Sequence, residues 1–387
     1  MFKSKLIKCL HDRGFINDCT DLKGLDELLQ NKKITSYIGY DATASSLHVG
    51  HLVNIMMLRW FQKEGHRVIT LLGGGTTKIG DPSQRSSQRP LLEDGVIKNN
   101  LDQLKQIFSK YLTFSKQFPD ALMVNNNDWL SKLNYLDFLR DIGKHFSINR
   151  MLTFDTVKSR IEKNEPLSFL EFNYMILQGY DFYKLNQDFQ CVLQMGGSDQ
   201  WGNIINGMEL TRRLTNNKVF GLTSPLLTNA SGQKMGKSAS GAVWLNAESL
   251  SPYEFWQFWR NCDDADVQKF LLLFTEIPPD ECKKMTEKKG EGLNQAKIQL
   301  ANQITELCHG KAESEKAFST SRVIFGKNQG KENLPLIELS IEVFDGEINI
   351  IKILTHTKLV KSGKEARRLI SEKAIKLQDE NIENIST

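Results

Sequence analysis

Two short stretches of the chain carry residues that could bind phosphate. Residues 231–241 read SGQKMGKSASG and place Lys234 and Lys237 three residues apart among glycines and serines. Two cations on a segment of low bulk suit an anionic group that the backbone approaches closely. The segment is not a P-loop, because three residues separate Gly232 from Gly236 where that motif has four. The alternative is a solvated turn with two lysines.

The second stretch, SLHVGHL at 46–52, places His48 and His51 on either side of Gly50. It lies where a predicted strand passes into a predicted helix. In an open α/β sheet, ligands bind outside the carboxyl ends of the strands, and helix N-termini there attract phosphate. The stretch is therefore a candidate nucleotide site, with two surface histidines as the simpler interpretation.

The elements that must position these residues follow from the periodicity of the apolar residues. Residues 34–40 and 67–72 read as strands, and 49–64 between them reads as a helix. Strand, helix and strand at this spacing predict a βαβ unit and a parallel sheet. Residues 95–175 are expected to be largely helical, and 189–195 to form another buried strand.

The second half of the chain changes character. Ser251 and Glu254 form a capping box with Pro252 at the first helical position, and helical patterns continue to about residue 325. The predicted organisation is an α/β domain with a helical insertion, an α-helical domain, a linker rich in Gly, Asn and Lys, and a small basic α+β module. Their predicted bounds are 1–246, 247–325, 326–346 and 347–387.

Composition excludes several classes of protein. The 387 residues are 40% hydrophobic and 25% charged, with a formal net charge of +4, as in a globular protein of two or three domains. No apolar run approaches the ~18 residues of a membrane span, and the first residues do not read as a signal peptide. The six cysteines are scattered without a CxxC pair. We therefore expect a cytoplasmic protein with no protein-bound metal site.

HVGH and KMGKS, in this order, resemble the HIGH and KMSKS signatures of class I aminoacyl-tRNA synthetases. In that family the lysine loop is mobile and holds the leaving pyrophosphate. Glycine and serine would supply the mobility here, and Lys234 and Lys237 the charge. The resemblance thus explains the composition of the loop.

Residues 171–182, EFNYMILQGYDF, would place Tyr174, Gln178 and Asp181 on one face of a helix. Such a polar face is often solvated, but the flanking residues are too apolar for a simple surface helix. The stretch resembles the tyrosine-binding helix of bacterial-type tyrosyl-tRNA synthetases. Similar likenesses cover essentially the whole chain: YIGYDATASSLHVGH (37–51), GGGTTKIGDPS (73–83), NNNDW (125–129), QMGGSDQWGNI (194–204) and KMGKS (234–238).

The resemblance implies roles for individual residues. The implied tyrosine-binding residues, with the first two on the phenol, are Tyr37, Asp181, Asp41, Asp81, Asn126, Tyr174, Gln178 and Gln200. The implied ATP-binding residues are Gly39, His48, Gly50, His51, Gly197, Asp199 and Lys237. The residues implied to act on the reacting phosphates are Thr43, His48, His51, Arg85, Arg89, Lys234, Lys237 and Ser238. The chain departs from the family at Ile38, where a ribose contact is expected to be missing, and at Gly236, which we expect to make the loop more flexible.

The resemblance also implies the reaction and the partners. The carboxylate of L-tyrosine would attack the α-phosphate of ATP, and the tyrosyl group would then pass to tRNA(Tyr). Because a carboxylate is already a nucleophile, catalysis should rest on positioning and charge stabilisation. Mg²⁺ would arrive with ATP. Members of the family are homodimers, and the apolar-rich insert at about 130–165 is the expected interface.

The C-terminal residues suggest RNA binding. Ser362 should begin a helix that carries Lys364, Arg367 and Arg368 on one face, with Lys361 just before it and a short strand at 374–377 after it. The stretch KLVKSGKEARRLI resembles the S4 RNA-binding module, although the glycine turn usual after its strand reads QDEN here. The alternative is an ordinary helix with a solvated cationic face. The module is either short or incomplete.

Three other functions share some of these features. A tryptophan-specific sister synthetase has both signatures, but Tyr37 and Asp181 argue against it. A small-molecule nucleotidylyltransferase of the same superfamily needs neither the helical domain nor the basic tail. An RNA-binding protein derived from a synthetase would have no reason to keep every catalytic position.

Overall fold

The computed structural model describes residues 2–83, 87–238, 241–325, 337, 339, 349–357, 359–360, 362–372, 374–377 and 380–382. The chain divides into two compact units, Met1–Phe318 and Ser319–Thr387. No helix among these residues is long and apolar enough to cross a membrane.

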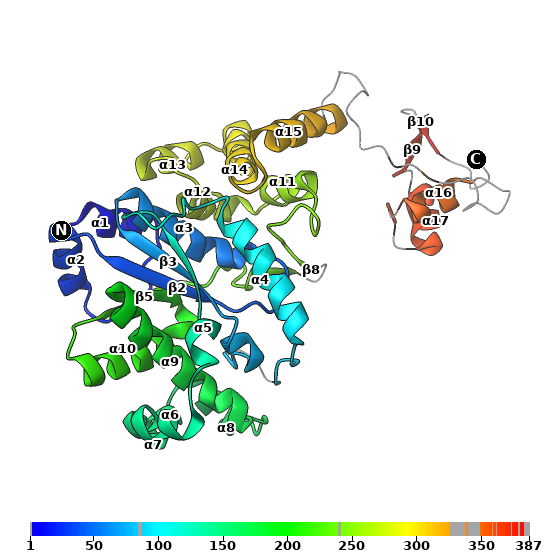
Figure 1. The fold of residues 1–387 in the computed structure, drawn as a ribbon. Helices are drawn as coiled ribbons and strands as arrows, with labels where there is room; N and C mark the ends of the chain where they lie inside the picture. Colours follow the sequence, from blue (N-terminus) through cyan, green and yellow to red (C-terminus); the bar gives the residue numbers. More distant parts are fainter. Residues whose placement is uncertain are drawn as a thin grey trace. The chain divides into compact units, whose positions relative to one another are not determined.

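The first unit is built on one mixed sheet (Figure 1). Within the described residues its strand order is β1-β6-β5-β2-β3-β4. Neighbouring strands are parallel except for β1, which pairs antiparallel with β6. The strands are β1 (Asp18–Cys19), β2 (Thr35–Tyr40), β3 (Arg67–Leu72), β4 (Leu122–Asn125), β5 (Cys191–Gly197) and β6 (Phe220–Ser224).

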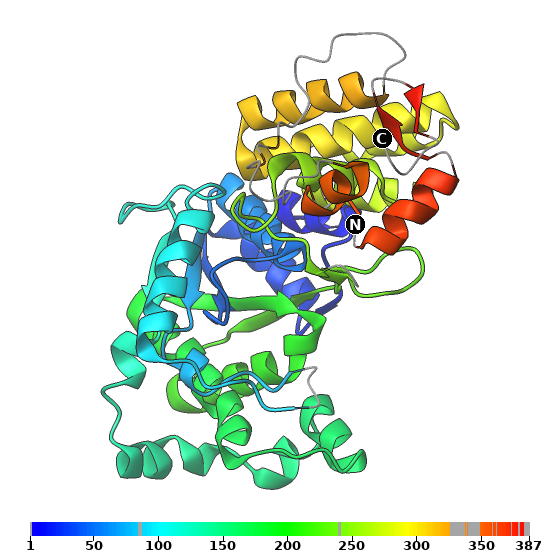
Figure 2. The same ribbon diagram turned by 90° about the vertical axis from the view of Figure 1, so that its right-hand side faces the viewer.

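Helices cover both faces of this sheet (Figures 1 and 2). The helices up to β6 are α1 (Lys5–Asp12), α2 (Leu22–Asn31), α3 (Val49–Lys63), α4 (Asp94–Phe108), α5 (Asn127–Leu130), α6 (Tyr135–Asp141), α7 (Ile148–Met151), α8 (Asp155–Glu162), α9 (Phe169–Phe189) and α10 (Trp201–Thr215). Those that follow are α11 (Pro252–Arg260), α12 (Val267–Phe274), α13 (Pro279–Thr286), α14 (Glu291–His309) and α15 (Lys311–Phe325).

The alternation of side chains along β2 explains the two layers. Ile38 belongs to the large core that α3 completes, whereas Tyr37 belongs to a second cluster with Phe182 and Leu185 of α9. Helix α3 is apolar on most of its circumference because it is buried in this way, and Gly65, whose φ is +78°, follows its C-cap Glu64. The predicted βαβ unit is thus confirmed within a residue at each boundary.

One predicted boundary was wrong, and one strand was not predicted. The stretch 95–175 is largely helical, as expected, but Leu122–Asn125 within it forms the edge strand β4 beside β3. A run of four apolar and polar residues has no periodicity that separates strand from helix. The strand predicted at 189–195 begins at Cys191, since α9 continues to Phe189 and Gln190 ends it in the left-handed conformation, at φ 53°.

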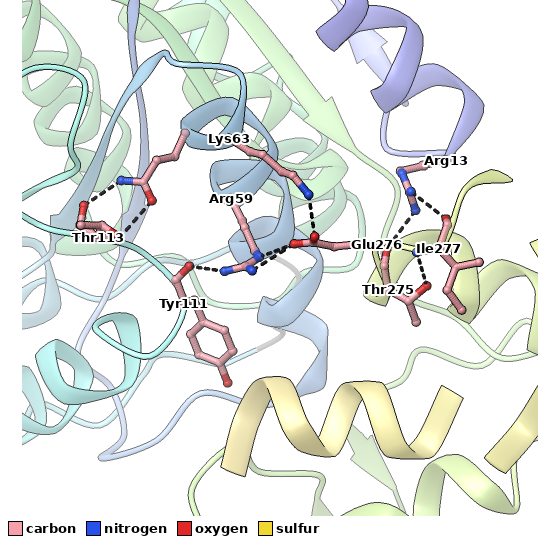
Figure 3. Close-up of polar contacts among 9 residues, drawn as sticks. Arg13, Arg59, Lys63, Tyr111, Thr113, Thr275, Glu276 and Ile277 are labelled. Atoms are coloured by element: carbon pink, nitrogen blue, oxygen red, sulfur yellow. Dashed lines mark hydrogen bonds and ion pairs between the residues drawn. The ribbon is translucent and has the colours of Figure 1, made fainter. Parts of the chain in front are cut away.

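The connection between α12 and α13 is fixed to α1 and α3 (Figure 3). The guanidinium of Arg13 lies 4.4 Å from the centroid of the Trp60 ring and donates to the carbonyl oxygens of Thr275 (2.9 Å) and Ile277 (2.8 Å). Arg13 is buried, and it satisfies carbonyls that the end of α12 leaves unpaired. Glu276 accepts hydrogen bonds from Arg59 and Lys63 of α3. The connection between α12 and α13 is therefore anchored to α3, the helix that begins after His48.

The second unit contains α16 (Ile350–His356), α17 (Gly363–Ser371) and the antiparallel pair β9 (Lys376–Leu377) and β10 (Glu380–Asn381). Its small core includes Leu354, Ala366 and Ile370. Ser362 accepts a hydrogen bond from the amide of Glu365, as predicted for the start of α17. The predicted strand at 374–377 is shorter and begins at Lys376. Apart from residues 337 and 339, the predicted linker 326–346 lies outside the described residues.

Candidate active site

The sheet reverses its strand order between β2 and β5. From β2 the chain continues to β3 and β4 on one side, and from β5 it continues to β6 on the other. Ligands of open α/β sheets bind at the carboxyl ends of the strands at such a point. Asp41 directly follows β2 there, and Asp199 and Gln200 lie in the turn Ser198–Gln200 that follows β5.

Tyr37 and Asp181 form the buried end of this site. Tyr37 is 1% exposed, its ring centroid lies 5.4 Å from that of Phe182, and its hydroxyl has no hydrogen-bond partner among the described residues. Asp181 accepts hydrogen bonds from Nδ2 of Asn126 (2.9 Å) and Nε1 of Trp129 (2.8 Å). Burial nevertheless raises the pKa of Asp181 to about 7. The two side chains thus offer a buried hydroxyl and a buried carboxyl to one ligand.

A second carboxylate, Asp41, is joined to Asp181 through a chain of hydrogen bonds. Asp41 accepts from the hydroxyls of Thr76 (2.7 Å) and Tyr174 (3.0 Å). Nδ2 of Asn126, which donates to Asp181, also donates to Oγ1 of Thr76 at 2.9 Å. Burial raises the pKa of Asp41 to about 6, and the nearby charge of Asp81 adds to this shift. These hydrogen bonds fix the carboxyl groups of Asp41 and Asp181 relative to each other.

Gln178, Gln200 and Asp81 form a third part of the site. Nε2 of Gln178 donates to Oε1 of Gln200 (3.3 Å), and Nε2 of Gln200 donates to Oδ2 of Asp81 (3.0 Å). Nε of Arg89 donates to the backbone carbonyl of Asp81 at 2.9 Å. Desolvation raises the pKa of the neighbouring Asp199, and the Asp81 charge acts in the same direction. Several carboxylates in one half-buried site suit a cationic group of a ligand.

The histidine turn opens helix α3. Nδ1 of His48 accepts the amide hydrogen of Gly50 (3.1 Å), and Nδ1 of His51 accepts the amide hydrogen of His48 (3.3 Å). Both rings therefore carry their proton on Nε2 when neutral. Burial, with His48 as the second cause, holds the pKa of His51 well below its usual value. The turn thus presents two imidazoles at a helix N-terminus, and the lowered pKa keeps that of His51 neutral.

The lysine segment contacts the histidine turn. The amide of Val49 donates to the carbonyl of Val243 (2.9 Å), and the amide of Val243 donates to the carbonyl of Gly236 (3.3 Å). A Cβ atom on Gly236 would lie 2.9 Å from Nδ1 of His48, and the φ of Gly236 is +124°. A side chain at position 236 would therefore clash with His48, which is a steric requirement for glycine in addition to the flexibility expected from the sequence.

Other predicted residues are placed as follows. Lys234 is exposed, and its charge opposes the rise in the pKa of Asp199. Lys237 and Ser238 form β7, which pairs with β8 (Gly241–Ala242); their side chains, like the whole of Arg85, lie outside the described residues. Thr43 and Gly39 are exposed. Gly197 is buried, and a Cβ atom at this position would lie 2.5 Å from the carboxylate of Asp199.

The described residues contain no group of three or more His, Cys, Asp or Glu side chains that could hold a metal ion. In the second unit, Lys364, Arg367 and Arg368 of α17 are exposed while Ala366 and Ile370 are buried. Arg368 also pairs with Glu372 at 3.0 Å. Lys361 lies outside the described residues.

Sequence reasoning missed two residues of this site. Thr76 lies in the stretch GGGTTKIGDPS and Trp129 in NNNDW, so both stretches were singled out for other residues. A hydroxyl and an indole have no charge that marks them in a sequence. Only the fold brings Trp129 of α5 against Asp181 of α9.

Comparisons with known proteins agree with this geometry. Residues 29–326 match the family described as "tRNA synthetases class I (W and Y)". A tyrosine–tRNA ligase of Dinoroseobacter shibae is 56% identical over 97% of this chain and 90% of its own length. A tyrosine–tRNA ligase of Roseobacter denitrificans is 56% identical over 99% of this chain and 92% of its own length.

Among solved structures, a C-terminally truncated mitochondrial tyrosyl-tRNA synthetase of Aspergillus nidulans superposes with a TM-score of 0.74. It is 32% identical in sequence, and the match covers 83% of this chain and 94% of that one. The family match, the sequence identity and the coverage together show the family of this chain. It belongs to the class I tRNA synthetases of the tryptophan and tyrosine group and, within that group, to the bacterial-type tyrosine–tRNA ligases.

Proposed function

We propose that the chain activates L-tyrosine with ATP, which gives tyrosyl-adenylate and pyrophosphate, and then transfers the tyrosyl group to the 3′ end of tRNA(Tyr). The observation that carries this proposal is that the hydroxyl of Tyr37, which has no hydrogen-bond partner among the described residues, is buried together with Asp181, whose charge raises the pKa of Tyr37 after the larger effect of burial. A phenol has one hydroxyl, which can donate to Asp181 and accept from Tyr37. The names of the curated relatives also favour tyrosine over tryptophan.

Discrimination against phenylalanine would follow from the same two residues. The hydroxyl of Tyr37 and the carboxyl of Asp181 are buried. Phenylalanine would leave them without a ligand partner, and an unsatisfied buried polar group costs about 1–3 kcal/mol. Asp81, Tyr174 and Gln178 would bind the ammonium group of tyrosine. Asp41 and Gln200 would border the substrate and its carboxylate, and Asn126 would support the pocket.

The adenylation step would need no general base, because the attacking carboxylate is already ionised. Gly39, Gly197 and Asp199 would line the adenosine. His48 and His51 would donate from Nε2 to the phosphates, next to Thr43 and Gly50. The cations assigned to the departing pyrophosphate are Arg85, Arg89, Lys234 and Lys237, with the hydroxyl of Ser238. Preorganised donors aimed at developing charge usually contribute most to the rate enhancement in such catalysis. Mg²⁺ would enter bound to ATP, as part of that substrate.

The test is pyrophosphate–ATP exchange with tyrosine, tryptophan, phenylalanine or no amino acid. We expect exchange that depends on tyrosine alone. Exchange with tryptophan would indicate the sister specificity. Exchange without an amino acid would indicate a different nucleotidylyltransferase. Absence of exchange in a protein that still binds RNA would favour a synthetase-derived RNA-binding protein.

The domain division and the RNA contacts belong to this proposal as well. Residues 1–246 would form the catalytic domain, 247–325 an α-helical domain on the anticodon side, 326–346 a linker, and 347–387 an S4-like RNA-binding module. The exposure of Lys364, Arg367 and Arg368 supports a contact with the phosphates of tRNA, to which Lys361 would add.

The protein would work as a homodimer in the cytoplasm. Large apolar side chains are exposed along the insert between β4 and α9, namely Tyr135, Leu136, Ile148 and Ile161, and at Phe169, the first residue of α9. Such a concentration of exposed apolar side chains marks an interaction surface, and a second copy of the chain would cover it. Sedimentation equilibrium should give a dimer that Leu136→Lys with Ile148→Lys converts to a monomer.

A further inference from the structure

The segment before the lysines is a hairpin with its own hydrogen bonds. The amide of Met235 donates to the carbonyl of Leu227 (2.7 Å), and the amide of Asn229 donates to the carbonyl of Gln233 (2.9 Å). Lys234 lies in the returning arm, opposite Thr228. We call residues 227–235 the lysine hairpin. Whatever holds its first arm in place therefore also sets the position of Lys234.

Two residues of the helical region contact that first arm. Asp266 directly precedes α12 and is 3% exposed. Its Oδ2 accepts the amide hydrogen of Ala230 at 2.8 Å, and its Oδ1 pairs with Nζ of Lys269 at 2.8 Å. Nζ of Lys269 in turn donates to the carbonyl of Thr228 at 2.5 Å. The pair thus contacts a backbone donor and a backbone acceptor two residues apart on the hairpin.

This arrangement is not explained by the needs of α12. Asp266 occupies the N-cap position, where a carboxylate usually accepts from the amides of its own helix, yet its side chain makes no capping hydrogen bond. Both carboxylate oxygens are instead used on Ala230 and Lys269. A buried carboxylate needs such partners. The carboxylate of Asp266 therefore holds the lysine hairpin and not the start of α12.

We propose that Asp266 and Lys269 are positioning residues for adenylate formation, which hold the lysine hairpin so that Lys234 faces the pyrophosphate of ATP. The role in adenylate formation rests on the proposed function. The position of the hairpin rests only on its contacts with Asp266 and Lys269. The other end of α12 is anchored to α3 through Arg13. The short helix α12 therefore connects the lysine hairpin to α3, the helix whose first turn carries His48 and His51. A loop that only had to be mobile would need no such attachment.

The energetic logic is that of preorganisation. A flexible hairpin that must be ordered in each turnover loses transition-state stabilisation, because ordering costs conformational entropy. The two contacts hold the backbone near Lys234 before ATP arrives, while nothing lies within 4 Å of the Cβ position of Gly232, so the tip of the hairpin has room to move.

The first experiment measures adenylate formation and hydrogen exchange in Asp266→Ala and Lys269→Met. We expect the pre-steady-state rate to fall about tenfold or more, as for the loss of a hydrogen bond to a charged group. The KM for ATP should rise while the affinity for tyrosine is unchanged. Amides of residues 227–235 should exchange faster. Lys269→Arg should restore much of the rate, because it keeps a donor to the carbonyl of Thr228.

Glu276→Gln is the matched control. It also breaks an ion-paired contact between the helical region and α3, but it lies at the far end of α12 from the hairpin. We expect normal hydrogen exchange of the hairpin and a normal rate in this variant. An equal loss of rate in Glu276→Gln and Asp266→Ala would overturn the proposal, because general loosening of the helical region would then suffice.

A double-mutant cycle with Lys234→Ala separates positioning from stability. If Asp266 acts through Lys234, Asp266→Ala should slow the Lys234→Ala enzyme little further. Additive losses would contradict the proposal, as would faster exchange of the hairpin with an unchanged rate. If Asp266→Ala fails to fold, Asp266→Asn and Lys269→Met supply the same cycle. A wild-type protein without tyrosine-dependent exchange would refute the proposed function, whereas hydrogen exchange of the hairpin would still report the contacts.

Discussion

Gly236 of the lysine segment lies against the ring of His48 at the start of α3. A Cβ atom on Gly236 would be 2.9 Å from Nδ1 and 3.0 Å from Cε1 of that ring. The ring itself is fixed, because its Nδ1 accepts the amide hydrogen of Gly50. The two signature motifs are thus packed to a tolerance that excludes a single methyl group.

Gly236→Ala should therefore displace either the segment or the His48 ring. We expect adenylate formation to slow by about tenfold, which corresponds to about 1.4 kcal/mol, with tyrosine affinity unchanged. Gly232→Ala is the matched control, because Gly232 also has a positive φ, +80°, but nothing lies within 4 Å of its Cβ position. Equal losses in the two variants would assign the effect to backbone strain instead of the contact.

His48→Asn and His51→Ala should slow adenylate formation while they leave tyrosine affinity nearly unchanged. Loss of one donor to developing charge costs roughly 10²–10³-fold in rate. Asparagine is a favourable N-cap residue, so His48→Asn keeps the start of α3 while it removes the imidazole. Stopped-flow measurement of the tyrosine-bound enzyme with ATP gives the rate. A variant with weak tyrosine binding and a normal rate would contradict the assignment.

Tyr37→Phe should weaken tyrosine binding and reduce the preference for tyrosine over phenylalanine. The variant removes one buried hydroxyl, an effect of about 1–3 kcal/mol. Tyr40→Phe is the control, because the hydroxyl of Tyr40 is also buried without a hydrogen-bond partner in the described part of the chain, but its ring packs on Phe108 in the other core cluster. Calorimetry with both amino acids should show a change for Tyr37→Phe only.

Tyrosine affinity should rise with pH and level off above about pH 7. The phenol donates most strongly to an ionised Asp181, whose pKa burial raises to about 7. The same raised pKa means that Asp181 contributes stability to the fold in full below its unfolded pKa of about 4, and that this contribution is lost as the pH rises through 7. Trp129→Phe removes a donor to the carboxylate and should move the midpoint of the binding curve upward. An unchanged midpoint would mean that Asp181 does not titrate in this range.

Replacing Lys364, Arg367 and Arg368 with glutamine should flatten the salt dependence of tRNA binding. Three phosphate contacts correspond to a slope of about −2 to −3 in log affinity against log salt. Pyrophosphate exchange should be unaffected, because every residue assigned to that step, including Asp266 and Lys269, lies before residue 270.

The control for that measurement replaces three exposed lysines of α1 and α2, namely Lys5, Lys8 and Lys23. It removes the same charge from a surface to which we assign no RNA contact. Equal slopes for the wild type and the α17 variant would show that the helix has only a solvated cationic face and that the tRNA is held elsewhere, for which the helical domain 247–325 is the next candidate.

Local sequence was sufficient for the elements and for much of the chemistry. Strand 35–40, helix 49–63 and the start of α11 at Ser251 follow from periodicity and capping residues, which act over a few positions. The burial of the polar face of α9, with Tyr174 and Asp181, also followed from its apolar neighbours. The edge strand β4 was missed, since four residues carry too little pattern to separate strand from helix.

Contacts between distant segments required the fold. Trp129 donates to Asp181 across 52 positions of sequence, and Asp266 accepts from the amide of Ala230 across 36. Neither partner is marked by periodicity, because an indole and an N-cap aspartate have ordinary local interpretations. The sequence by itself determined which groups are available for the chemistry: carboxylates, imidazoles, lysines and a phenol. Tertiary structure decided which of them are buried together and held in place, because burial and hydrogen bonding depend on the packing of α5, α9 and α12 around the sheet.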